Sequence, residues 1–230
     1  MKRLNGIKKY FNKFNNHTYM GEQTKRGLQS AYVCNGASNH SEVERELNDF
    51  YATPPIATKE LIKYLKENYP EIDNDIIWEP ACGKGHISQC LIDADYNVMS
   101  TDLYDRGFAG GKYGADNDFL NVKNETHTNC HIITNPPYKY AQEFVEKAME
   151  ILEDGKICCM FLKLTFLEGK KRYEMFKKYP PEKILVFSSR VNCAHSGDFE
   201  KEPERGGAVA YAWYIWRKGN TNSPVIEWIK

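Results

Sequence analysis

The sequence predicts an α/β fold with a seven-stranded, mostly parallel sheet, a C-terminal antiparallel hairpin and helices on both faces. The first observation is that short apolar runs alternate with segments whose apolar residues recur at helical spacing. Such alternation is typical of parallel strands covered by helices on both sides. The runs are IIWEPA at 76–81, YNVMSTDL at 96–103, HIITNPP at 131–137, KICCMFLKL at 156–164, KILVFSS at 183–189 and AYAWYIW at 210–216.

The second observation is the position of helix signals between these runs. Thr53 can cap a helix whose first turn carries Pro54 and Pro55 and which ends near Pro70. Further helices are expected at 86–94, 139–153 and 170–178, so each crossover is long enough for a strand–helix–strand unit. The last two runs are separated by a polar loop without a helix signal, which predicts the antiparallel hairpin.

Length and charge limit the organisation of the chain. Its 230 residues suffice for one substantial core, and we expect a basic and aromatic arm at 1–48, a catalytic domain at 49–218 and a tail at 219–230. Lysine plus arginine and aspartate plus glutamate each number 31. The chain as a whole therefore has no basic excess with which to bind a polyanion, and any nucleic-acid contact has to come from local patches.

The seven cysteines show neither paired CxxC spacing nor a secreted framework. We expect reduced thiols, no metal site and a cytoplasmic protein. No run approaches the roughly 18 apolar residues that a membrane span needs, so no membrane association is expected.

Two strand ends carry residues suited to a nucleoside. The run at 76–81 continues into Glu79-Pro80-Ala81-Cys82-Gly83-Lys84-Gly85, where glycines permit close approach of a ligand to the main chain. The next run ends in Asp102, whose carboxylate can accept both hydroxyl hydrogens of a ribose. Because the turn lacks the full phosphate-binding glycine pattern, it favours a nucleoside without phosphates, such as S-adenosylmethionine. Leu103 and Tyr104 could flank its adenine, and Asp118 in Asp118-Phe119-Leu120 could accept from the adenine amino group.

The most specific feature is Asn135-Pro136-Pro137-Tyr138 at the end of a strand. Two consecutive prolines stop the strand ladder and leave the Pro136 carbonyl without a strand partner. The Asn135 side-chain oxygen and that carbonyl can both accept from one planar amine. Tyr138 can stack on a flipped base and offset part of the cost of extruding it.

Taken together, these motifs resemble the adenine-N6 DNA methyltransferases of the NPPY type, in particular the compact type of bacteriophages and prophages. The resemblance covers residues 49–218 and implies a Rossmann-like S-adenosylmethionine methyltransferase fold in a bacterial cell or phage-infected host. It implies that residues 49–55 form the amino-terminal cofactor segment, with Tyr51, Thr53 and Pro54 lining the methionine end. It further implies that Glu79, Pro80, Ala81, Gly83 and Gly85 form the glycine motif, that Asp102, Leu103, Asp118, Phe119 and Asn135 also contact the cofactor, and that residues 210–216 form the final strand.

Larger members of this family carry a separate target-recognition domain, for which this chain has little room. Specificity is then expected from loops, the basic arm, a homodimer or a separate specificity partner. Lys170, Lys171 and Arg172 on the helix at 170–178, and Arg190, are candidate contacts to nucleic acid, although a solvated helix face explains the first three equally well. Other readings stay open: methylation of adenine in RNA, methylation of a protein glutamine, and an inactive module that binds nucleic acid or a host protein.

Overall fold

The computed structural model describes residues 50–123, 129–195, 199 and 209–230, all within one compact unit, Arg45–Lys230. The basic arm expected at 1–48 lies outside the described residues. Within the described part of the chain, no helix combines the length and the apolar character needed to cross a membrane.

The unit is built on an eight-stranded sheet with the order β10-β7-β9-β6-β5-β2-β3-β4. Neighbouring strands run parallel, except that β9 is antiparallel to both β6 and β7. The strands are β2 (Ile76–Glu79), β3 (Asn97–Asp102), β4 (Gly111–Tyr113), β5 (His131–Thr134), β6 (Ile157–Lys163), β7 (Lys183–Phe187), β9 (Tyr211–Arg217) and β10 (Val225–Ile229). The predicted α/β class with a mostly parallel sheet is confirmed.

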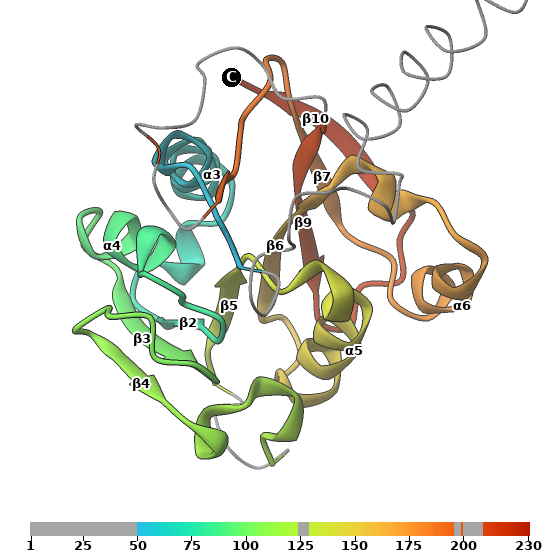
Figure 1. The fold of residues 1–230 in the computed structure, drawn as a ribbon. Coiled ribbons are helices and arrows are strands. Elements are labelled where there is room, and N and C mark those ends of the chain that lie inside the picture. The colour runs from blue at the N-terminus through green and yellow to red at the C-terminus, as the bar shows by residue number, and fades with distance from the viewer. Residues whose placement is uncertain (1–49, 124–128, 196–198, 200–208) are drawn as a thin grey trace, which may run out of the picture. The chain divides into compact units, whose positions relative to one another are not determined.

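Helices cover both faces of the sheet, as predicted. In Figure 1, α3 and α4 lie on one side of it and α5 and α6 on the other. The two hydrophobic clusters follow this division, because α3 and α4 contribute to one and α5 and α6 to the other. The helices are α3 (Pro55–Asn68), α4 (His86–Ile92), α5 (Ala141–Ile151) and α6 (Lys170–Lys178), with short 3₁₀ helices η2 (Pro70–Ile72), η3 (Ala115–Asn117), η4 (Phe119–Asn121), η5 (Tyr138–Tyr140) and η6 (Leu164–Leu167).

The strand count differs from the seven expected. The six apolar runs all form strands, and β7 and β9 are the predicted antiparallel pair. The two additional strands are β4, only three residues long, and β10, which lies in the segment expected as a tail. β10 pairs with β7 in register from Val225 opposite Lys183 to Ile229 opposite Phe187, so the sheet extends to the end of the chain.

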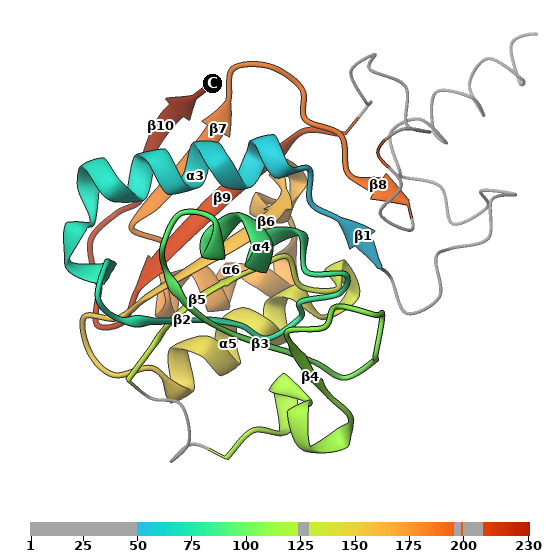
Figure 2. The same ribbon diagram turned by 90° about the vertical axis from the view of Figure 1, so that its left-hand side faces the viewer.

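A second, two-stranded sheet joins the start of the described chain to its later part. β1 (Tyr51–Ala52) pairs antiparallel with β8 (Ala194–His195), as Figure 2 shows. The register sets Tyr51 opposite His195 and Ala52 opposite Ala194, although these residues are far apart in the sequence.

Candidate active site

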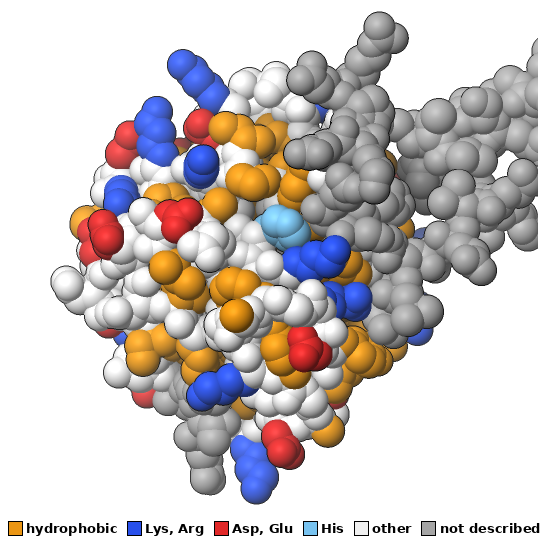
Figure 3. Space-filling view, turned by 60° about the vertical axis from the view of Figure 1, so that its left-hand side comes forward, with side chains coloured by type: hydrophobic (Ala, Val, Ile, Leu, Met, Phe, Trp, Pro, Cys, Tyr) orange, Lys and Arg blue, Asp and Glu red, His pale blue; other side chains and the backbone are white. Residues whose placement is uncertain are grey.

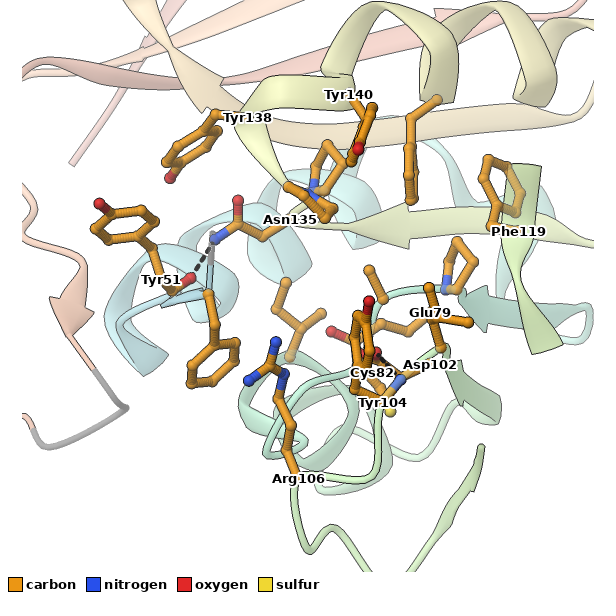
Figure 4. A pocket seen from close by; sticks show the side chains of 18 of the residues that line it. Tyr51, Glu79, Cys82, Asp102, Tyr104, Arg106, Phe119, Asn135, Tyr138 and Tyr140 are labelled. Carbon is orange, nitrogen blue, oxygen red and sulfur yellow. Dashed lines mark hydrogen bonds between the residues drawn. The ribbon is translucent and has the colours of Figure 1, made fainter. Parts of the chain in front are cut away.

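A cavity of about 700 Å³ opens at the carboxyl ends of β2, β3 and β5. These three strands are parallel neighbours, so the residues at their ends meet at one edge of the sheet. Glu79 ends β2, Asp102 ends β3 and Asn135 follows β5, and all three line the cavity. Figure 4 shows the side chains of these residues around the same space.

Most of the residues predicted for the cofactor and the catalytic motif line this cavity. Pro54, Gly83 and Gly85 are not among the lining residues. Pro54 instead precedes α3 as its N-cap residue. The predicted residues that do line it are Tyr51, Thr53, Glu79, Pro80, Ala81, Asp102, Leu103, Tyr104, Asp118, Phe119, Asn135, Pro136, Pro137 and Tyr138.

The glycine turn lies next to the cavity, because Cys82 and His86 on either side of it line the cavity. Gly83 and Gly85 have φ angles of +54° and +79°, in the left-handed region that favours glycine. A Cβ at Gly83 would collide with the Phe50 ring, and one at Gly85 with the Phe108 ring. The two glycines therefore allow aromatic rings from other segments to pack directly on the turn.

The Asp102 carboxylate is fixed by the backbone around it. Its Oδ2 accepts from Gly83 N at 2.8 Å, and its Oδ1 accepts from Tyr104 N at 2.9 Å. Burial raises the pKa of this carboxyl above its ordinary value, whereas the two backbone N–H groups and Arg106 act in the opposite direction. Each oxygen keeps a further lone pair, so a ligand hydroxyl can still donate to it.

Glu79 has a structural task that the sequence did not indicate. It is only 2% exposed, and its Oε2 accepts from Ser88 N at 2.7 Å and from the Ser88 hydroxyl. Ser88 Oγ in turn lies 2.5 Å from Ser100 Oγ. Burial raises the pKa of Glu79 to about 8. The side chain thus connects β2 to α4 and β3 while also lining the cavity.

The Asn135 amide is held in one orientation. Its Nδ2 donates to the Tyr51 carbonyl at 2.8 Å and to Thr53 Oγ1 at 2.9 Å. A carbonyl can only accept, so these contacts require the amide nitrogen on that side and the oxygen on the other. Asn135 Oδ1 is buried and has no hydrogen-bond partner among the described residues. Thr53 was expected to cap α3, but it makes no capping bond there and positions Asn135 instead.

Tyr138 is surrounded by other side chains. Its ring stacks on Tyr51 with centroids 5.7 Å apart and planes at 24°, and Lys163 Nζ lies 5.0 Å from the ring centroid. Its Oη is 3.4 Å from Cys193 Sγ. The face of Tyr138 that Tyr51 covers is therefore not open to a base in this structure.

Asp118 and Phe119 are held by local contacts. Asp118 caps η4, where its Oδ1 accepts from Leu120 N at 3.1 Å and its Oδ2 from Asn121 Nδ2 at 2.7 Å. Phe119 is buried between Trp78 and Phe144, with ring centroids 5.2 and 4.8 Å away. Both residues stand in the cavity wall, and most of Phe119 belongs to the core.

The structure does not bring the predicted nucleic-acid residues to the cavity. Lys170, Lys171, Arg172 and Arg190 are not among its lining residues. Arg172 donates from Nε to the Phe166 carbonyl at 2.7 Å and also to the Glu168 carbonyl, so its guanidinium braces the turn before α6. On the face drawn in Figure 3, basic and acidic side chains of the described residues are scattered among apolar ones.

Several lining residues were missed by the motif analysis. Lys139 and Tyr140 directly follow the predicted catalytic motif, and this position in the sequence could have indicated that they line the cavity. Arg106 lies in a loop without a recognisable sequence pattern, and it reaches the cavity wall only because of how that loop folds. The missed residues are His86, Ile87, Arg106, Asn121, Lys139, Tyr140 and Phe144.

Solved structures share this fold at low sequence identity. A candidate class I S-adenosylmethionine-dependent methyltransferase of Listeria monocytogenes has a TM-score of 0.55 at 14% identity, over 90% of this chain and 72% of that chain. A candidate RNA methyltransferase of Pyrococcus horikoshii has a TM-score of 0.54 at 16% identity, over 84% and 98%. The M protein of the type I restriction enzyme EcoKI has a TM-score of 0.53 at 17% identity, over 83% and 47%.

No family model and no curated protein sequence matches the chain. The structural likeness therefore establishes the architecture and leaves the substrate to be argued from the site. The chain has the Rossmann-like α/β fold of the class I S-adenosylmethionine-dependent methyltransferases.

Proposed function

We propose that this chain transfers a methyl group from S-adenosylmethionine to the exocyclic N6 amine of a flipped adenine in DNA. The observation that carries the proposal is the Asn135 amide, whose nitrogen is bound to Tyr51 and Thr53 and whose buried oxygen has no partner among the described residues. A buried acceptor without a donor is costly in a folded protein. An amino group of a substrate placed in the cavity would satisfy it.

The residues of the cavity fit the proposed cofactor. When bound, S-adenosylmethionine supplies an electrophilic methyl group on a positively charged sulfur. Asp102 would accept from the ribose hydroxyls with an orientation already set by Gly83 and Tyr104. Leu103 and Tyr104 would flank the adenine ring of the cofactor. The cavity volume of about 700 Å³ is within the usual range for a small-molecule site.

The catalytic motif would act by accepting hydrogen bonds. Asn135 Oδ1 and the Pro136 carbonyl would each accept one N–H of the target amine, which orients the nitrogen lone pair away from both acceptors. These bonds strengthen as the nitrogen becomes more positive during the transfer, so they stabilise the transition state more than the ground state. As the N–C bond formed, the C–S bond of S-adenosylmethionine would break and S-adenosylhomocysteine would leave as a neutral thioether. The methylated nitrogen would then lose its extra proton to water, so no strong general base is needed.

Stacking of the target base on Tyr138 requires a local rearrangement. Tyr51 covers one face of that ring at a centroid distance of 5.7 Å. A base entering on this side would have to displace Tyr51, whose main-chain carbonyl also accepts from Asn135. Moving Tyr51 to admit a base would therefore also disturb the hydrogen bond that orients the Asn135 amide.

The test is mass spectrometry of nucleosides from the DNA and RNA of cells that lack N6-adenine methylation. Three cultures would express the wild type, Asn135→Ala, and Asn97→Ala as a matched control at an exposed position at the start of β3. We expect N6-methyladenine in DNA with the wild type and with Asn97→Ala, and none with Asn135→Ala. Full methylation by Asn135→Ala would contradict the mechanism. Methylated adenine confined to RNA would contradict the DNA assignment, and no modified nucleoside would contradict nucleic-acid methylation.

A further inference from the structure

β10 forms one edge of the main sheet in the described part of the chain, and Figure 2 shows it beside β7 at the margin of the sheet. Trp228 is 71% exposed, the highest fraction among the large apolar side chains described, and Ile226 is 49% exposed. Neither residue belongs to a hydrophobic cluster of the described protein. An exposed apolar edge strand is a template for pairing with another strand.

The main-chain groups of β10 divide between β7 and the outer side of the sheet. Val225 N donates to the carbonyl of the residue before β7 at 3.1 Å, and the Ile229 carbonyl accepts at 2.8 Å from the N–H of the residue after β7. In a parallel ladder the N–H and C=O groups of one residue point to the same side, and successive residues alternate. Ile226 and Trp228 therefore direct their main-chain groups outward, away from β7.

The side chains of these two residues lie on one face of the sheet. On the other face, Tyr64 Oη of α3 donates to Glu227 Oε2 at 2.8 Å, and Ile229 is buried in the cluster to which α3 contributes. Because side chains alternate along a strand, Ile226 and Trp228 lie on the face opposite α3. Outward main-chain groups and exposed apolar side chains thus occur at the same two positions of β10.

The spacing of these positions suits a two-fold contact, because Glu227 lies midway between them. If a second β10 paired antiparallel about Glu227, Ile226 of each copy would oppose Trp228 of the other. Each such pair would exchange two main-chain hydrogen bonds. Pairs of an aromatic and a β-branched residue across two strands are favourable, and an isologous contact of this kind closes at two copies.

The charges at the centre of this contact are compensated within each copy. Glu227 would oppose Glu227 of the second copy, and two unpaired carboxylates there would repel each other. Glu227 Oε1, however, lies 2.5 Å from Lys183 Nζ, and Oε2 accepts from Tyr64. The centre would hold two carboxylates and two ammonium groups, so it would carry no net charge.

We infer that β10 is the interface of a homodimer in which two copies pair antiparallel about Glu227 and join their sheets. At 71% exposure, a Trp228 side chain of about 250 Å² leaves roughly 180 Å² per copy to bury. A standard stable interface buries about 800 Å² per partner, and one pair of five-residue strands covers less. We therefore expect a weak dimer, with a Kd of about 1–100 µM.

Sedimentation velocity of the full chain tests the dimer over concentrations from about 1 µM to about 200 µM, which bracket the expected Kd. We expect the wild type to change from monomer to dimer across this range. Trp228→Lys places a charge on the edge and should stay monomeric. Tyr173→Lys is the matched control, because it changes an aromatic residue on α6 that is 60% exposed, and it should dimerise like the wild type. A wild type that is monomeric throughout, or equal dimerisation of Trp228→Lys, would overturn the inference.

Cysteine cross-linking of the dimer tests the register. In Glu227→Cys the two introduced residues would form a non-hydrogen-bonded pair with Cα atoms about 4.5 Å apart, close enough for a disulfide. In Val225→Cys they would be offset by about 13 Å along the strands, too far for a disulfide. After mild oxidation we expect a covalent dimer of Glu227→Cys, and of Val225→Cys only the level seen with the wild type and its seven cysteines. Equal cross-linking of both variants would overturn the register, and a dimer that cross-links through neither would overturn the pairing of β10.

Discussion

At the scale of single residues, the candidate site is set by how one amide is oriented. Asn135 could present either its oxygen or its nitrogen to the cavity, and the difference between them is chemical, because only the oxygen accepts. Two acceptors, the Tyr51 carbonyl and Thr53 Oγ1, decide the orientation. Thr53 is 2% exposed, so its hydroxyl is desolvated and its contact with Asn135 is well defined.

Thr53→Val tests this positioning under the proposed function. Valine has the shape of threonine without the acceptor, so one Asn135 N–H loses its partner while the cavity wall keeps its volume. We expect kcat for methyl transfer to fall roughly tenfold, equivalent to about one hydrogen bond, with little change in the affinity for S-adenosylhomocysteine. Thr53→Ser keeps the hydroxyl and should retain most of the activity. Equal rates for the Val and Ser variants would show that Thr53 does not orient the amide.

The buried Glu79 should make stability depend on pH. Its pKa is raised from an ordinary 4.5 to about 8 by burial. Between these values the unfolded chain ionises while the folded protein keeps the proton, so the contribution of Glu79 to stability is complete below about pH 4.5 and is lost as pH rises toward 8. The expected slope is at most roughly 1.4 kcal/mol per pH unit.

Urea unfolding of the wild type and Glu79→Gln from pH 5 to pH 8 measures this effect. Glutamine stays neutral and its amide oxygen can still accept from Ser88. We expect the free energy of unfolding of the wild type to fall relative to that of the variant as pH rises. Parallel pH profiles for the two proteins would mean that Glu79 is ionised in the folded state.

At the scale of elements, the sequence patterns predicted the strands that are buried. They missed the strands whose conformation depends on pairing with a neighbouring strand. β6 is buried along almost its whole length, so its continuous apolar run was a clear signal. β4 has three half-exposed or exposed residues between glycines, and no periodicity could reveal it. In β10, Trp228 is 71% exposed and Ile229 is 9% exposed, so its strand character comes from pairing with β7.

The same distinction applies to the candidate site. The motifs at the ends of β2, β3 and β5 were predicted because strand ends converge in a parallel sheet. Arg106 was missed because its place depends on the loop packing against Phe50 from a distant segment. The expected capping role of Thr53 was wrong because a tertiary contact with Asn135 used its hydroxyl.

At the scale of the whole molecule, the balance of 31 basic and 31 acidic residues limits how the proposed DNA substrate could be bound. A neutral protein gains little from long-range attraction, so affinity has to come from a few phosphate contacts. The described surface in Figure 3 shows charges of both signs side by side. The sequence before the described residues has a local basic excess. Positions 1–40 carry seven lysine or arginine residues and one acid: Lys2, Arg3, Lys8, Lys9, Lys13, Lys25 and Arg26 against Glu22.

Deletion of residues 1–44 tests whether this basic segment contacts the polyanion. The remaining chain, Arg45–Lys230, is one compact unit, so the truncated protein should fold. Each phosphate contact that is lost reduces the slope of log K against log salt by about 0.9 on duplex DNA. We expect fluorescence anisotropy across a salt series to show a slope lowered by several such contacts, with unchanged affinity for S-adenosylhomocysteine. The same slope for the full-length and the truncated protein would place the DNA contacts on the compact unit. Charge reversal at Lys139 and Lys163, which flank Tyr138, would then be the next variants to measure.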